Sequence, residues 1–135
     1  MAFKADNGKY LSRILWLPTG QNTIEAAKSS KDHFTRFRAT QSDGKLLLKA
    51  DNGLYLSRIH RSGIDYIEAK KSTPDVFCHF AVHNQPDGTV VLQADNGKYL
   101  SRVRRDVSDR GDVDYIEAYK TQIDVFCKFK LEFQL

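Results

Sequence analysis

Short apolar runs alternate with polar residues along the whole chain and are interrupted by glycine-containing turns. The runs around Lys-Tyr-Leu-Ser-Arg, around Ile-Glu-Ala and around a pair of phenylalanines are each long enough for one strand, and none has a helical period long enough for a helix. Asn-Gly at 7–8, 52–53 and 96–97 lies between such runs, which predicts two-residue hairpin turns with positive φ at both positions. The pattern therefore predicts an all-β chain.

The same order of strands and turns occurs three times. The segment Ala5–Ile14 returns as Ala50–Ile59 and as Ala94–Val103, at steps of 45 and 44 residues. Each copy is followed by Ile-Glu-Ala and then by Asp-x-Phe-x-x-Phe, which we assign to a further strand. A unit of this size cannot bury a core alone, so three units must share one domain over 1–135. The units span about residues 1–45, 46–90 and 91–135.

Twelve short strands in three pseudo-symmetric four-strand repeats are what a β-trefoil requires: six strands close a barrel and three hairpins cap its open end. Residues repeated in every unit are expected to build this barrel. The expected buried layers are Leu11, Leu56 and Leu100, then Ile24, Ile67 and Ile116, then Phe37, Phe80 and Phe129.

Four further repeated positions also have a structural interpretation. We expect the repeated tyrosines to pack beneath the cap with a bonded hydroxyl, and each aspartate before Asn-Gly to serve the turn. Strand alternation points each repeated arginine outward, beside the glutamate of a neighbouring strand. The tyrosines are Tyr10, Tyr55 and Tyr99, the aspartates Asp6, Asp51 and Asp95, the arginines Arg13, Arg58 and Arg102, and the glutamates Glu25, Glu68 and Glu117.

These motifs resemble known β-trefoil families. Gly-x-Tyr-Leu-Ser followed by Asp-x-Phe-x-x-Phe resembles the fascin and hisactophilin type, and Lys-Tyr-Leu-Ser-Arg-Ile with Asp65–Ala69 and Pro74-Asp75 is more similar to amaranthin-type agglutinins, which are plant lectins. The closer resemblance implies a non-enzymatic lectin for galactose or N-acetylgalactosamine glycans, with its site where two protomers of a homo-oligomer meet. That family usually carries two trefoils in tandem, and this chain has one. The more distant resemblance implies an actin-binding module, and a scaffold without a small ligand is a third hypothesis.

A ligand site is expected where the three repeats differ, because identity is explained by the barrel. The segments after the second strand of each unit are assigned to loops, and the first contains Trp16, which is a ligand platform, an association surface or a partly buried plug. Arg110-Gly111-Asp112 matches an integrin-binding tripeptide and is interpreted as a chance match in an exposed turn. The candidate ligand-binding residues are Trp16, His60, Arg61, Tyr66, Arg104 and Tyr115.

Composition narrows the remaining classes of function. The chain is 41% hydrophobic and 28% charged, without an apolar run long enough for membrane insertion. A net charge of +4 without a dense basic stripe argues against nucleic acid, and no nucleophile, cofactor or metal-ligand pattern recurs. The start at Met1 enters the first repeat directly, so we expect a cytoplasmic protein. Cys78 and Cys127 are then expected to be buried free thiols.

Overall fold

The computed structural model describes residues 1–17 and 19–133, and these contain twelve strands, four in each repeat. The strands of the first repeat are β1 (Ala2–Lys4), β2 (Tyr10–Trp16), β3 (Gln21–Lys28) and β4 (Arg38–Ser42). Those of the second are β5 (Lys45–Lys49), β6 (Tyr55–Arg61), β7 (Ile64–Lys71) and β8 (Ala81–Asn84). Those of the third are β9 (Val90–Gln93), β10 (Tyr99–Val107), β11 (Gly111–Lys120) and β12 (Lys130–Glu132). The predicted β-trefoil is confirmed.

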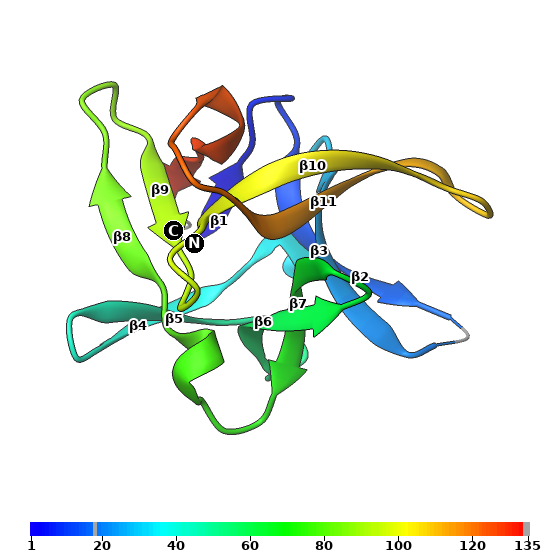
Figure 1. Cartoon of the computed structure of the whole chain (residues 1–135), viewed down its shortest axis with the longest axis horizontal. Helices are drawn as coiled ribbons and strands as arrows, with labels where there is room; N and C mark the ends of the chain where they lie inside the picture. The colour runs from blue at the N-terminus through cyan, green and yellow to red at the C-terminus, as the bar shows by residue number, and fades with distance from the viewer. Residues whose placement is uncertain (18, 134–135) are drawn as a thin grey trace.

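Antiparallel pairs join each repeat to the next. Strand β4 pairs with β5, β8 with β9, and β12 with β1, so the third repeat closes onto the first. The hairpins β2–β3, β6–β7 and β10–β11 meet through single-residue pairings between β3, β7 and β11. Figure 1 shows the β10–β11 hairpin as a long ribbon that reaches well beyond the body of the molecule. The three hairpins therefore converge on the pseudo-threefold axis, and their tips carry the differences between repeats.

The core is filled by the residues that the repeats share. All nine predicted layer residues are buried in one cluster, with alanines such as Ala26 and Ala69 between them. Tyr10 is also buried, and its hydroxyl donates to Glu132 Oε1 at 3.0 Å, as expected for a tyrosine beneath the cap. Its counterparts Tyr55 and Tyr99 are half-buried. Three copies of a small apolar set thus supply one core that no single copy could form.

The Asn-Gly turns differ from the prediction. The Gly8 amide donates to the Ala5 carbonyl at 3.0 Å and the Ala5 amide donates to the Lys9 carbonyl at 2.8 Å, which closes a three-residue loop. In this loop type only the glycine needs positive φ, and Gly8 has a φ of 78°. Two-residue turns with positive φ at both positions occur instead at Asp43-Gly44 and Ser62-Gly63.

The Asp-x-Phe-x-x-Phe segments also differ, because each begins with a short 3₁₀ turn where a strand was expected. The turns are η1 (His33–Thr35), η2 (Val76–Cys78) and η3 (Val125–Cys127). Asp75 caps η2 by accepting a hydrogen bond from the Phe77 amide at 3.1 Å, a local contact that competes with strand formation. The first phenylalanine of the motif is consequently partly exposed, and the second returns to the core.

The two thiols match their prediction. Cys78 and Cys127 end the second and third 3₁₀ turns, and both are buried and free. Burial raises the pKa of both thiols, because it disfavours the charged thiolate.

The expected pairing of repeated arginines with repeated glutamates is wrong. Arg58 lies opposite Ile67 in the β6–β7 ladder, while Glu68 lies opposite Ser57 and is buried. Arg58 instead donates from Nε and Nη2 to the Asp95 carboxylate at 2.8 and 2.9 Å. Equivalent bidentate contacts join Arg13 to Asp51 and Arg102 to Asp6.

These three contacts, here called the inter-repeat ion pairs, each join the arginine of one repeat to the turn aspartate of the next. The pair Arg102–Asp6 joins the last repeat to the first, so the ring is closed. Hydrogen bonding from Arg13 lowers the pKa of Asp51, which keeps that carboxylate charged. The repeated aspartates therefore have a second role that turn chemistry did not predict.

No helix among the described residues is long and apolar enough to cross a membrane. Within the same residues, no group of three or more His, Cys, Asp or Glu side chains is placed to hold a metal ion.

Candidate functional site

A pocket of about 560 Å³ opens on the pseudo-threefold axis between the three hairpins, and we call it the axial pocket. Its size falls within the range of about 300–1,000 Å³ that is usual for small-molecule sites. The first hairpin contributes Trp16, Thr19, Gln21 and Thr23, the second Arg61 and Tyr66, and the third Arg105, Asp106, Val107, Ser108 and Tyr115. The segments after the second strand of each unit, which were assigned to loops, are mostly strands that extend the hairpins toward this pocket.

The inner wall comes from one position of the repeat, which precedes Ile-Glu-Ala. It is Thr23 in the first repeat, Tyr66 in the second and Tyr115 in the third. The two tyrosine rings lie edge to face with centroids 5.2 Å apart, and burial raises the pKa of both phenols. Both hydroxyls therefore stay protonated near neutral pH and can donate or accept hydrogen bonds.

The sides of the pocket come from a second position, three residues after the repeated arginine. It holds Arg61 and Arg105 in the second and third repeats but Trp16 in the first. Arg61 pairs with Glu68, and Arg105 Nε donates to Glu117 Oε2 at 2.6 Å. These glutamates are only 2% and 1% exposed, so each arginine balances a buried charge.

The longer third hairpin replaces the arginine that the first repeat lacks. Arg110 donates from Nη1 and Nη2 to Glu25 at 2.9 and 2.7 Å, and its guanidinium lies 5.2 Å from the centroid of the Trp16 ring. Arg110 therefore balances the third buried glutamate and packs on the tryptophan at once. Arg110 is also the arginine of the Arg-Gly-Asp tripeptide, and its guanidinium is bonded to Glu25.

Four of the six predicted ligand-binding residues meet in the axial pocket: Trp16, Arg61, Tyr66 and Tyr115. The other two lie elsewhere. His60 is mostly exposed and its Nδ1 lies 2.9 Å from Asp65 Oδ1, while Arg104 bonds to Asp114 at the outer face of β10. Strand alternation separates Arg104 from Arg105, so only the second faces the axis.

Sequence reasoning missed several residues of the axial pocket, notably Arg105, Asp106 and the supporting Arg110. One signal was available: aligning the repeats on the repeated arginine places Trp16 in the same position as Arg61 and Arg105. The role of Arg110 had no such signal, because it depends on the tip of a longer hairpin reaching the first repeat.

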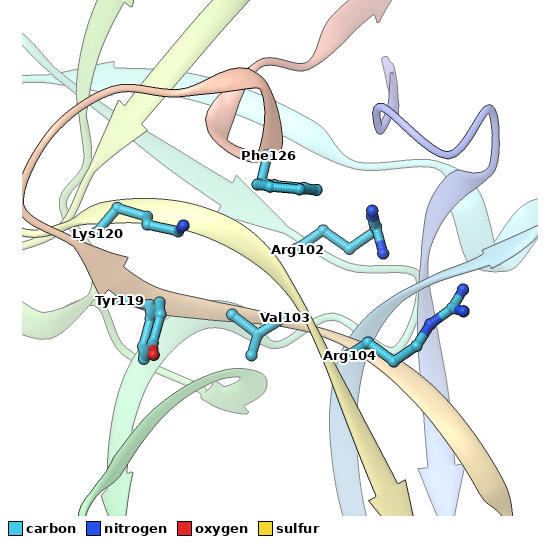
Figure 2. Close-up of a pocket in the computed structure, with 6 residues that line it drawn as sticks. All are labelled: Arg102, Val103, Arg104, Tyr119, Lys120 and Phe126. Carbon is cyan, nitrogen blue, oxygen red and sulfur yellow. The ribbon is translucent and has the colours of Figure 1, made fainter.

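A second kind of hollow lies on the outside of the barrel, between the base of a hairpin and the following 3₁₀ turn. In the third repeat, the groove of about 430 Å³ is lined by Arg102, Val103, Arg104, Tyr119, Lys120 and Phe126 (Figure 2). In the first repeat, the equivalent groove of about 280 Å³ is lined by Arg13, Ile14, Leu15, Lys28 and Phe34. We call them the repeat-3 groove and the repeat-1 groove.

Comparisons with known proteins agree with the fold. No protein-family model matches the chain, and no curated protein matches it in sequence. A designed threefold symmetric protein, ThreeFoil, is similar with a TM-score of 0.75 and 16% identity, covering 96% of this chain and 94% of that one. A structural-genomics protein of unknown function from Caenorhabditis elegans is similar with a TM-score of 0.72 and 18% identity, covering 96% of this chain and 90% of that one. The Haemophilus ducreyi cytolethal distending toxin is similar with a TM-score of 0.69 and 15% identity, covering 97% of this chain and 81% of that one. At these identities the likeness establishes a threefold β-trefoil and no more.

Proposed function

We propose that the protein is a non-enzymatic carbohydrate-binding module whose sugar site is the axial pocket. The observation that carries the proposal is the convergence of an indole and two phenol rings with hydrogen-bonding side chains, one set from each hairpin. Sugars bind proteins through stacking of their apolar face on aromatic rings and through hydrogen bonds to their hydroxyls, and this pocket offers both.

The polar groups suit neutral hydroxyls. The arginines at its sides are each paired with a buried glutamate, so their charge is already balanced. Gln21 and Ser108 in the lining provide acceptors, and the two tyrosines provide hydroxyls that donate or accept. A neutral hexose or N-acetylhexosamine has complementary groups, and the resemblance to amaranthin-type agglutinins makes galactose and N-acetylgalactosamine the first sugars to test.

The single tryptophan makes the proposal easy to test, because Trp16 lines the pocket and its emission reports occupancy. Titration with galactose and with N-acetylgalactosamine is expected to change the emission saturably. Tyr66→Phe should weaken the response about tenfold, since it removes a hydroxyl that bonds to the sugar. Tyr55→Phe is the matched control, because Tyr55 lies on the same hairpin and outside the pocket lining.

A flat titration with both sugars, or equal weakening by the two substitutions, would contradict the axial site. Cosedimentation with actin filaments should accompany the titration, since an actin-binding module is the alternative from the sequence. Filament binding together with a flat titration would replace the proposal. The mass in solution, measured with and without sugar, tests the expected homo-oligomer.

A further inference from the structure

The repeat-3 groove differs from the axial pocket in the side chains of its lining. Three cationic side chains line it, Arg102, Arg104 and Lys120, and its lining contains no carboxylate. Their counter-ions Asp6, Asp114 and Asp124 lie outside the lining. The groove therefore presents N–H donors without a competing carboxylate in its lining.

Donors remain available at the mouth of this groove. Lys120 Nζ bonds to Asp124 at 2.7 Å, which uses one of its three N–H donors. Arg104 bonds to Asp114 through Nε and Nη2, which leaves Nη1, and its side chain is 58% exposed. A ligand group that reaches either cation must offer acceptors, and a negatively charged group fits best.

Aromatic and apolar surface adjoins these cations. Figure 2 shows the side chains gathered around strand β10, with Tyr119 and Lys120 from the end of β11 and Phe126 from η3. Tyr119 is 52% exposed and Phe126 37% exposed, and Lys120 Nζ lies 5.8 and 5.2 Å from their ring centroids. Exposed rings beside a cation suit a ligand with an apolar face and an acidic substituent.

Only the third repeat has this combination. Tyr119 corresponds to Ala27 in the first repeat and to Lys70 in the second, while Arg104 corresponds to Leu15 and His60. Lys120 and Phe126, in contrast, recur as Lys28 with Phe34 and as Lys71 with Phe77. The repeats thus supply the lysine and phenylalanine, and the third repeat adds a second ring and a second exposed cation.

We propose that the repeat-3 groove is a second binding site, specific for an acidic sugar residue that carries a carboxylate or a sulfate. Its ring packs against Tyr119 and Phe126, and its acid group bonds to Lys120. The ligand class rests on the proposed glycan binding, whereas the charge and ring arrangement does not. The protein would then hold one glycan at two points, one neutral and one acidic.

The test compares calorimetric binding of three probes: neutral galactan oligosaccharides, sulfated galactan oligosaccharides and polygalacturonate oligosaccharides. Wild-type protein should bind at least one acidic probe more tightly than the neutral one, and whether the sulfate or the carboxylate probe prevails identifies the acid group. Lys120→Gln should weaken that binding about tenfold, because it removes a charged donor. Lys71→Gln is the matched control, since Lys71 makes the same contact with Asp75 at 2.6 Å in the second repeat.

Equal losses in Lys120→Gln and Lys71→Gln would show diffuse charge attraction and overturn the proposal, as would equal binding of acidic and neutral probes. An acidic peptide that binds as tightly as the acidic sugars and with the same dependence on Lys120 would overturn the assignment to glycans. The Trp16 emission response to neutral sugar tests the axial pocket separately. If neutral sugar does not change the Trp16 emission but Lys120→Gln still weakens binding of the acidic probe, only the axial site is contradicted. If the emission responds but Lys120→Gln has no effect, only the repeat-3 groove is contradicted.

Discussion

The belt of inter-repeat ion pairs and the axial pocket are built from the same three repeats, yet one keeps the symmetry and the other breaks it. Around the belt, each arginine makes the same bidentate contact with the next turn aspartate at 2.7 to 2.9 Å. At the axis, equivalent positions hold Trp16, Arg61 and Arg105, and Arg110 compensates for the missing arginine. Identity among repeats thus serves closure of the barrel, and divergence creates a pocket with a unique shape.

The largest effect should come from the core that all three repeats share. Leu56→Ala is expected to lower the free energy of unfolding by about 2–5 kcal/mol, because it leaves a cavity in the core cluster. Chemical denaturation monitored by circular dichroism measures this change. Leu15→Ala, at an exposed position of β2, should change it by less than about 0.5 kcal/mol.

The next effect concerns the belt. Arg58→Ala should cost about 1–3 kcal/mol, because it leaves Asp95 without its charged donor at a position only 13% exposed. Arg13→Ala and Arg102→Ala should cost similar amounts if the belt is symmetric. Arg38→Ala, at an exposed site on β4, serves as the control in the same denaturation experiment. Unequal losses among the three would show that the repeats do not share closure evenly.

A smaller effect should appear in acid, through Asp51 and Asp114. Hydrogen bonding from Arg13 lowers the pKa of Asp51. Burial alone would raise the pKa of Asp114, but the hydrogen bonds that it accepts from Arg104 and Arg102 outweigh burial and lower that pKa. The folded state therefore binds protons less readily than the unfolded state, whose aspartate pKa is 3.8. This stabilisation is complete above that value and is lost as the pH falls through the folded pKa values.

Denaturation midpoints should accordingly agree at about pH 7 and pH 5 and fall at about pH 3. In the triple variant with Arg13, Arg58 and Arg102 replaced by glutamine, the fall of the denaturation midpoint between about pH 5 and pH 3 should be smaller. An undiminished fall in that variant would place the acid sensitivity outside the belt.

The sequence predicted the fold because the repeat carries it. Leu, Ile and Phe layers, turn glycines and strand alternation recur three times, and each recurrence supports the same topology. The errors occurred where local chemistry competes with alternation. Asp75 caps a 3₁₀ turn through the Phe77 amide, and Gly8 closes a three-residue loop.

The site was predicted in part, for a related reason. Trp16, Arg61, Tyr66 and Tyr115 diverge at positions that face the axis, so comparing repeats finds them. The partners of the buried glutamates could not be predicted, because strand alternation does not show that β3, β7 and β11 are covered on both faces. The ring of Glu25, Glu68 and Glu117 becomes buried only when three hairpins meet.

The central claim is that repeated residues hold the barrel together while divergent residues bind the ligand, and Trp16→Ala tests it most directly. Calorimetry should show affinity for N-acetylgalactosamine at least about tenfold weaker, with the free energy of unfolding lower by about 1 kcal/mol from the lost contact with Arg110. Leu17→Ala, on the same hairpin and 77% exposed, should change neither quantity. Unchanged affinity in Trp16→Ala, or a loss that only follows unfolding, would contradict the account.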